Sequence, residues 1–424
     1  MENIKRFDLG KGINFTYIPY SKFKTTQLSI CMFYPLKKET ASKNAIIPNL
    51  LTHSCKKFPS LISLSRKMEE LYGASVAASA EKVGDMQMIE ISAQSIDNKF
   101  VPDGSDNISQ IAKLLCDMVF EPDTKDENFK NENVELEKRQ LREEILAEMN
   151  DKKVFARKRC IEIMCKNEKF GINTLGEIED VDKINSETAY EAWKNLLSRS
   201  HIEIMLVGSG AYTKIADEFK TKFENIDRTN VFEYSSEILA AKDKPTEVTE
   251  HKNIVQCKLV LGLRIKSKNE KINYPAMKVM NALLGGTPQS KLFVNVREKL
   301  SLCYYCASRY MKQKKIMLIE SGVEEKNIQK AKEQILEQLK DIKLGNFSDT
   351  DLENTKLFIT QGLGKIGDSL SSIGSWYLSQ SIDKNIISPE EHIEEIKTVT
   401  REDVIEAANQ IALDTVYILS GKGE

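Results

Sequence analysis

Hydrophobic and polar positions alternate with a period of two near the start of the chain, which predicts strands at 4–9, 13–19 and 25–34. Helical periodicity follows and predicts helices at 44–58 and 61–72, the second stopping at Gly73, a residue type that often ends helices. The run from Ala74 to Ser95 then predicts two strands joined by a turn at Val83-Gly84-Asp85.

The rest of the chain contains mostly helical periods, broken once by a segment without a period. Helices are expected at 107–119, 126–151, 153–166, 187–197 and 211–223, with a buried strand at 201–210. Residues 226–247 include DKPTE and keep no period, so they predict a linker. The pattern restarts beyond it with strands at 254–265, 302–311, 315–322 and 415–421 and helices at 272–284, 289–299, 325–342, 349–382, 389–397 and 400–411.

The two parts of the chain repeat the same order of elements. An offset of 228 places Asn281 opposite His53 and keeps the order strand, helix, helix, strand, strand, long helices. We interpret this as the duplication of a unit of roughly 200 residues. Successive strands without an intervening helix favour antiparallel pairing. The predicted fold is α+β, with two homologous halves, 1–225 and 248–424, each a mainly antiparallel sheet with helices packed on one face.

Composition restricts the classes of partner. The 424 residues are 41% hydrophobic and 29% charged, which is typical of a globular protein, and the net charge of −2 gives no reason to expect nucleic acid or an anionic membrane. No run approaches the roughly 18 to 20 apolar residues that span a bilayer. The polar N-terminus lacks the apolar core of a signal peptide, so a cytoplasmic location is expected.

The eight cysteines are scattered and mostly lie in apolar segments, which predicts reduced, buried thiols. Cys303 and Cys306 have CxxC spacing, but on a regular strand residues three apart point to opposite faces. A zinc knuckle would also need a second ligand pair, which the sequence lacks. We therefore interpret both as ordinary interior residues.

One predicted helix carries a possible but incomplete metal site. Asn49 and His53 are one helical turn apart, and Thr52 lies beside them. Two histidines at 49 and 53 with an acid at 52 could hold zinc and activate water, but asparagine is a poor zinc ligand and threonine is no general base. The residues alone favour a helix histidine with a hydrogen-bonded partner.

Other candidate chemistry is weaker. Glu137 and Glu144 share one face of a charged helix, near Glu143 and Glu148, a pattern equally typical of a solvated, salt-bridged helix. The other three histidines are His201, His251 and His392, and the sequence contains neither GxSxG nor a Walker-type loop.

The stretch from Asn281 to Tyr305, NALLGG…SKLF…VREKLSLCYY, resembles the C-terminal half of the pitrilysin/insulinase family, including its smaller processing-peptidase-like bacterial members. Family members have a glycine break, here Gly285-Gly286, and then an arginine followed seven positions later by a tyrosine, here Arg297 and Tyr304. The paired halves fit as well, so the resemblance covers essentially the whole chain. It implies that the two halves close as a clamshell.

The resemblance also shows what this chain has lost. Catalytic members carry His-x-x-Glu-His and a distant glutamate ligand, where this chain has Asn49-Leu50-Leu51-Thr52-His53 and, by the same match, Glu144, with Glu137 at the accompanying acidic position. His53 and Glu144 are too few for a catalytic zinc, which normally has three protein ligands and a water. No metal is therefore expected in this chain.

Some members of the family are heterodimers in which one subunit keeps the zinc motif and the other keeps the arginine and tyrosine. The resemblance implies a chain of the second kind, without a cofactor of its own, paired with a homologous zinc-bearing subunit that acts on peptides. Arg297 would then hold the substrate, Tyr304 would donate to the oxyanion, and Gly285 and Gly286 would let backbone approach substrate or partner. Two alternatives remain: a self-sufficient zinc peptidase with an atypical site at His53 and Glu144, and a non-enzymatic peptide-binding or assembly scaffold.

Overall fold

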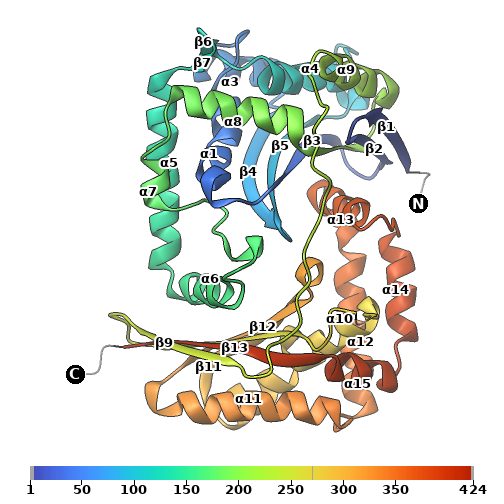
Figure 1. Ribbon diagram of the computed structural model, residues 1–424. Helices are drawn as coiled ribbons and strands as arrows, with labels where there is room; N and C mark the ends of the chain where they lie inside the picture. Colours follow the sequence, from blue (N-terminus) through green and yellow to red (C-terminus); the bar gives the residue numbers. More distant parts are fainter. Residues whose placement is uncertain (1–3, 270, 422–424) are drawn as a thin grey trace. The chain divides into compact units, whose positions relative to one another are not determined.

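The computed structural model describes residues 4–269 and 271–421, which divide into two compact units, each built on one β-sheet (Figure 1). The first unit contains the chain up to Leu146, together with Ile172–Ser235 and Gly367–Ile386. The second contains Ala147–Gly171, Ser236–Ile366 and the chain from Ile387 onward. Neither unit is therefore continuous in sequence.

The sheet of the first unit has six strands in the order β1-β2-β8-β3-β5-β4. In that order they are Lys5–Gly10, Ile13–Pro19, His201–Gly208, Thr25–Pro35, Met86–Ile96 and Ser75–Val83. Neighbouring strands are antiparallel except β2 and β8, which run parallel. The strand β4 lies at one edge of this sheet.

The sheet of the second unit has five strands in the order β9-β13-β10-β12-β11. In that order they are Thr246–His251, Ile411–Ser420, Cys257–Ile265, Ile316–Val323 and Cys303–Met311. Here β9 and β13 are parallel and the other pairs are antiparallel. The strand β11 lies at one edge.

The two sheets share one topology. Apart from β1, the order β2-β8-β3-β5-β4 matches β9-β13-β10-β12-β11 strand for strand, including the single parallel pair at the same place. A parallel pair requires a long crossover connection, so its recurrence at one position is a specific feature. The predicted α+β class with two homologous, mainly antiparallel halves is confirmed.

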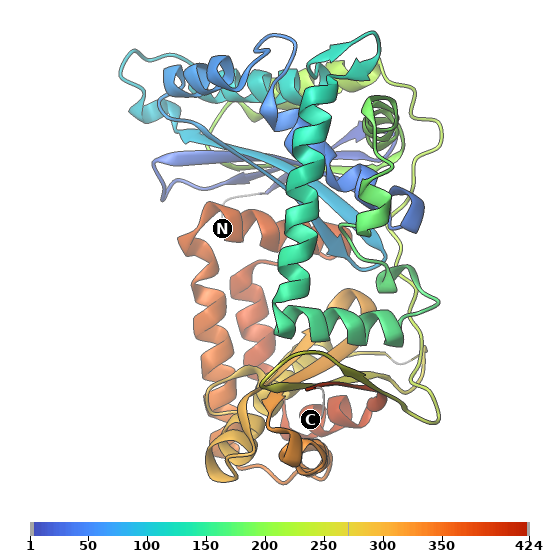
Figure 2. The same ribbon diagram turned by 90° about the vertical axis from the view of Figure 1, so that its left-hand side faces the viewer.

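Helices of the first unit cover the face of its sheet to which β3 presents Leu28, Ile30 and Met32. The alternation of apolar residues along this strand explains the one-sided core, since successive side chains point to opposite faces. These helices are α1 (Lys38–Ala45), α2 (Ile47–His53), α3 (Leu61–Glu70), α4 (Asn107–Phe120), α5 (Asn131–Asn150), α7 (Ile178–Val181), α8 (Ser186–Arg199) and α9 (Tyr212–Glu224). Figure 2 shows α5 as one unbroken helix, whose last residues belong to the second unit.

The second unit repeats this layering. Its helices are α10 (Tyr274–Asn281), α11 (Ile328–Lys343), α12 (Asp349–Gly364), α14 (Pro389–Thr398) and α15 (Arg401–Asn409), with α11 against β10 and α10 against α15. Short 3-10 turns lie at Asn98–Phe100, Lys169–Gly171, Lys312–Lys314, Glu325–Asn327 and Ile366–Asp368. Within the described ranges, no helix is long and apolar enough to cross a membrane.

In each unit, one helix packs on the other face of the sheet. That helix comes from the opposite half of the sequence. Helix α6 (Lys152–Met164) belongs to the second unit, where its Cys160 and Met164 pack against Val260 of β10. Gly262 permits this close approach, because a Cβ there would lie 2.5 Å from the sulfur of Met164. Helix α13 (Leu370–Ile382) belongs to the first unit, where Ser371 donates a 3.0 Å hydrogen bond to Gln27 of β3.

The predicted single helix at 349–382 is wrong. Helix α12 ends at Gly364, a 3-10 turn follows, and α13 begins at Leu370 with Ser369 accepting a hydrogen bond from the backbone of Ser372. A serine cap of this kind starts a new helix, because it satisfies backbone N–H groups that a continuous helix would bond internally. Helices α12 and α13 then lie in different units.

Two helix starts also differ from the prediction. The predicted helix 44–58 is two helices, α1 and α2, with Pro48 in the first turn of α2, where proline is tolerated. The predicted helix 126–151 begins only at Asn131, because β6 (Thr124–Lys125) and β7 (Asn128–Phe129) form a small hairpin before it. Residues 225–245, all of them described, contain neither helix nor strand, and the change of unit at Ser235 lies inside the predicted linker 226–247.

Candidate functional site

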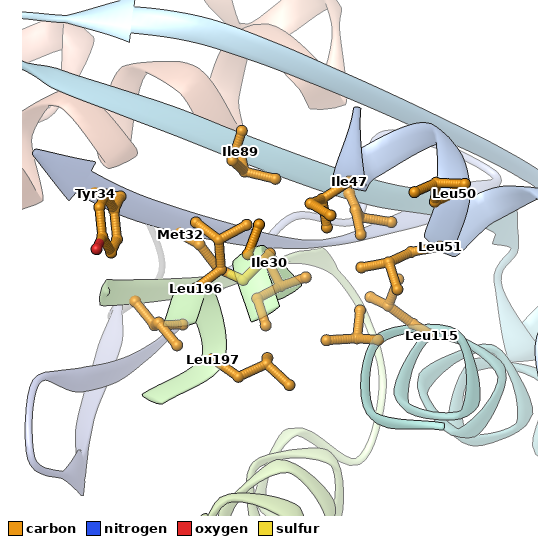
Figure 3. Packing of buried hydrophobic residues seen from close by; sticks show 14 of the residues in the cluster. Ile30, Met32, Tyr34, Ile47, Leu50, Leu51, Ile89, Leu115, Leu196 and Leu197 are labelled. Atoms are coloured by element: carbon orange, nitrogen blue, oxygen red, sulfur yellow. The ribbon is translucent and has the colours of Figure 1, made fainter. Parts of the chain in front are cut away.

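Helix α2 carries the degenerate motif and is held by its apolar face. Ile47, Leu50 and Leu51 are buried in the core of the first unit, among side chains of β3, β5, α4 and α8 (Figure 3). The helical period places positions 49 and 53 one turn apart and away from this buried face. The core therefore orients the helix, and the motif positions remain for contacts on its other side.

Asn49 contacts the long helix α5. Its side chain lies close enough to the carboxylate of Glu137, which is only 4% exposed, to influence the pKa of that group. Burial raises the pKa of Glu137, and the nearby amide of Asn49 partly opposes this. One carboxylate oxygen of Glu137 is buried without a hydrogen-bond partner among the described residues. The first position of the broken motif is thus tied to the acidic helix.

Thr52 and His53 complete the motif on α2. The hydroxyl of Thr52 donates to the backbone carbonyls of Pro48 and Asn49, at 3.0 and 3.2 Å. This back-bonding is the ordinary behaviour of threonine in a helix and uses its only proton. His53 is half-buried in the last turn, and Glu144 is exposed on α5.

These residues do not fit a zinc ion. Across residues 4–269 and 271–421, no group of three or more His, Cys, Asp or Glu side chains is arranged so that it could hold a metal. An amide at position 49 and a hydroxyl at position 52 provide neither a second imidazole nor a general base. No catalytic step through a metal of this chain's own is therefore derived.

The glycine break and its surroundings form the second set of candidate residues, in the second unit. Two π-helical segments, Ala282–Gly286 and Leu292–Lys299, flank the turn Thr287-Pro288-Gln289. Such i→i+5 segments are rare and often occur at functional sites. Gly285 packs tightly here, since a Cβ at this position would lie 2.6 Å from the backbone nitrogen of Ser308 on β11. A Cβ on Gly286 would meet nothing closer than 3.4 Å.

Arg297 lies on the second π-helical segment with a side chain that is 40% exposed. Its guanidinium stacks over the ring of Phe293, 4.6 Å from the ring centre, and its Nε is 3.4 Å from a carboxylate oxygen of Glu298. The aromatic contact and the surface ion pair orient the group weakly, so its fork of donors stays accessible.

Tyr304 lies near the start of the edge strand β11, at a β-bulge. Cys303 pairs with Val323 and Tyr305 with Gly322, so Tyr304 is the extra residue of the bulge. It is 58% exposed, and its hydroxyl lies 3.5 Å from a carboxylate oxygen of Glu324. A bulge aims a side chain away from the sheet, which is how Tyr304 reaches solvent.

The expectation that Cys303 and Cys306 point to opposite faces is wrong. The extra residue in the bulge restores the phase of the strand, so that Cys303 pairs with Val323 and Cys306 with Ser321 on the same face. Both thiols are buried and free. The signal in the sequence was the run Cys-Tyr-Tyr-Cys, because two adjacent aromatics between cysteines break the alternation of a regular strand.

The structure thus assigns the predicted site residues to two places. Asn49, Thr52, His53, Glu137 and Glu144 lie in the first unit, on α2 and α5. Gly285, Gly286, Arg297 and Tyr304 lie in the second unit, around two π-helical segments and β11. A duplicated α+β fold and a helix that lacks the zinc ligands of the resembled family are the features expected of an inactive metallopeptidase-like protein.

Comparisons with known proteins agree with that class. Residues 183–357 match the family described as "Peptidase M16 inactive domain". The "Probable inactive metalloprotease YmfF" of Bacillus subtilis (strain 168) is 33% identical over 410 residues, which cover 97% of this chain and 96% of that protein. The chain therefore belongs to the peptidase M16 family, the family of the pitrilysin/insulinase resemblance.

Solved structures show the same fold over the full length. A conserved protein from Enterococcus faecalis V583 superposes with a TM-score of 0.89 at 25% identity, covering all of both chains. A peptidase M16 inactive domain from Pseudomonas fluorescens and a protease from Helicobacter pylori each give a TM-score of 0.81, at 14% and 13% identity, covering 99% of both chains in each comparison. The low identities of the last two make them evidence for the fold alone.

Proposed function

We propose that this chain is the metal-free subunit of a heterodimeric zinc metallopeptidase and that it supplies Arg297 and Tyr304 to a peptide substrate bound at the partner's zinc site. One contrast carries the proposal. The motif helix has lost the groups that hold zinc, whereas Arg297 and Tyr304 both keep exposed, weakly engaged side chains. Exposed and weakly held side chains of this kind are what a subunit that contacts substrate requires.

The chemistry of the two side chains suits this role. Arg297 offers a planar fork of donors that could hold a substrate carbonyl or carboxylate. The hydroxyl of Tyr304 is 3.5 Å from Glu324, beyond the usual length of such hydrogen bonds, so exchanging that contact for a substrate oxyanion costs little. A tyrosine donor aimed at a developing oxyanion is a common form of transition-state stabilisation.

The implied partner is a homologous subunit with an intact His-x-x-Glu-His, which would contribute the zinc ion. The surface beside the glycine break offers apolar area for such a partner. The turn Thr287-Pro288-Gln289 and helix α12 line a hollow of about 210 Å³, bordered by Leu357 and Phe358, which are 55% and 47% exposed. Exposed apolar side chains gathered at one place are typical of interaction surfaces.

A cytoplasmic location and a bacterial processing role remain predictions.

The two alternatives make different predictions. A self-sufficient zinc peptidase would need a third ligand beside His53 and Glu144, and the described residues offer no such group. A peptide-binding scaffold would bind peptides and the homologous subunit without any turnover. Neither alternative gives Arg297 and Tyr304 a catalytic role in a partner's active site.

Reconstitution tests the proposal. This chain and a homologue with an intact motif are purified separately, and turnover of a library of quenched fluorescent peptides is measured for each alone and for the mixture. Turnover by the mixture, and by neither protein alone, supports the proposal. A stable complex without turnover selects the scaffold, and turnover by this chain alone with one equivalent of zinc selects the self-sufficient enzyme. A homologue with its motif glutamate changed to glutamine is the control that places the reaction in the partner.

A further inference from the structure

The bulge at Tyr304 brings together two thiols on the edge strand. Cys303 and Cys306 lie on the same face of β11, opposite Val323 and Ser321 of β12. They are 8% and 4% exposed. Two cysteines on either side of a bulge thus become direct neighbours on one face of the sheet.

The two neighbouring thiols interact and differ in acidity. Interaction with Cys306 lowers the pKa of Cys303 to about 7, with further lowering from Ser321 and from the positive charge of Arg297. The pKa of Cys306 is raised, because of its interaction with Cys303 and because its site is buried. One sulfur is therefore poised as a thiolate, and the other lies against it as a thiol.

Other cysteines of the chain lack this arrangement. Cys160 and Cys165 are also close in sequence and buried, but burial raises the pKa of Cys160 and raises that of Cys165 to about 12. Burial likewise raises the pKa of Cys31, Cys55 and Cys116. Such thiols react slowly, because the thiolate is the nucleophile.

We propose that Cys303 and Cys306 form a reversible thiol–disulfide pair that is oxidised by a hydroperoxide. The thiolate of Cys303 attacks one peroxide oxygen, the O–O bond breaks, and the product is a sulfenic acid on Cys303 with release of water or an alcohol. The sulfur of Cys306 then attacks that of Cys303, the S–O bond breaks, and a second molecule, water, leaves. Two thiols lose two electrons and two protons, and the peroxide is reduced. A small-molecule thiol reverses the reaction by exchange.

Oxidation of the pair would change the backbone of the bulge. A disulfide between the two cysteines would close a covalent ring around Tyr304 and Tyr305 and fix the backbone between them. It would also remove the thiolate whose pKa the positive charge of Arg297 helps to lower. The inference goes beyond the proposed function and does not depend on a partner subunit.

Peptide mapping of the intact folded protein tests it directly. Trypsin cleavage after Lys299 and Arg309 leaves both cysteines in the peptide Leu300–Arg309, and cleavage after Arg159 and Lys166 leaves the control pair in Cys160–Lys166. The protein is treated with hydrogen peroxide, remaining thiols are alkylated, and the digest is analysed by mass spectrometry without and with reduction. We expect Leu300–Arg309 to lose two hydrogens at least about tenfold faster than Cys160–Lys166, because the difference in thiolate content is large.

Single variants identify the order of events. Cys306→Ser should leave a sulfenic acid on Cys303 that a dimedone probe traps, whereas Cys303→Ser should leave Cys306 unlabelled under the same conditions. The proposal is overturned if the folded protein keeps both thiols of Leu300–Arg309 reduced, if both peptides are oxidised at one rate, or if the cysteines appear only in disulfides between molecules.

Discussion

The side chain of Asn49 lies close enough to the buried carboxylate of Glu137 to lower its pKa, so that a contact between α2 and α5 occupies the first position of the broken zinc motif. A neutral amide against a carboxylate replaces the imidazole that a metal site would require at that position. One oxygen of that carboxylate is buried without a hydrogen-bond partner among the described residues. The Asn49 position of the motif thus has a structural role, and the hydrogen-bonding capacity of the Glu137 carboxylate is incompletely satisfied.

Glu137→Gln should stabilise the protein at neutral pH, because the substitution removes a buried charge that Asn49 only partly compensates. Burial raises the pKa of Glu137 above its unfolded value, so the native state binds more protons and the free energy of unfolding of the wild type falls as pH rises through that window. We expect a gain of about 1 kcal/mol at pH 7 that disappears below about pH 4.5, where the carboxyl is protonated in both states. Urea unfolding at several pH values measures it.

Glu143→Gln is the matched control for that experiment, since Glu143 is exposed on the same helix. It should change the free energy of unfolding by less than about 0.5 kcal/mol at any of these pH values. A destabilisation by Glu137→Gln at pH 7, with no dependence on pH, would mean that the charged form of Glu137 is well compensated in the native state.

Zinc should not be part of the wild-type chain. We expect elemental analysis of the purified protein to find well under one equivalent of zinc, and dialysis against EDTA to leave the Tm unchanged, because a ligand that binds the native state would raise it. Asn49→His with Thr52→Glu should gain zinc-dependent stabilisation, whereas Asn49→Ala with Thr52→Glu should not. One equivalent of zinc in the wild type, with a lower Tm after its removal, would contradict the interpretation of α2.

The two adjacent glycines of the break should respond differently to alanine. Gly285→Ala places a Cβ 2.6 Å from the backbone nitrogen of Ser308 and should cost roughly 1 to 3 kcal/mol, since backbone on both sides must move. Gly286→Ala meets its nearest neighbours at 3.4 Å and should be close to neutral. Thermal unfolding of the two variants compares them, and equal losses would show that the break depends on chain flexibility instead of the approach to β11.

Most of the fold was predictable because periodicity reports burial. The alternation along β3 and the amphipathic helices of each half were visible in the sequence, and the repeated order of elements predicted the duplication that the matching strand orders show. The exchange of α6 and α13 between the units was not predictable, because a helix buries an apolar face in the same way against either sheet. The break between α12 and α13 depends on a serine cap at Ser369, a short-range signal inside a long apolar pattern.

The candidate site was predictable only where spacing alone defines it. Asn49, Thr52 and His53 share a helix, so their relation follows from 3.6 residues per turn. The contact between Asn49 and Glu137 joins residues 88 positions apart and needs the packing of α5 on α2. The bulge that exposes Tyr304 and aligns Cys303 with Cys306 is one extra residue in the pairing of β11 with β12. A regular alternation of hydrophobic and polar residues does not predict such an insertion.

The central claim is that Arg297 and Tyr304 act in a partner's active site, and its most direct test is the kcat/KM of the reconstituted pair. Arg297→Ala and Tyr304→Phe, measured separately with the zinc-bearing homologue, should each lower kcat/KM by about 10- to 1000-fold while the subunits still associate. Two control variants should leave kcat/KM unchanged. They are Arg309→Ala, at an exposed position of β11, the strand of Tyr304, and Tyr72→Phe, at an exposed tyrosine of the first unit. An unchanged kcat/KM in the Arg297 and Tyr304 variants, in a pair that hydrolyses peptide, would contradict the account.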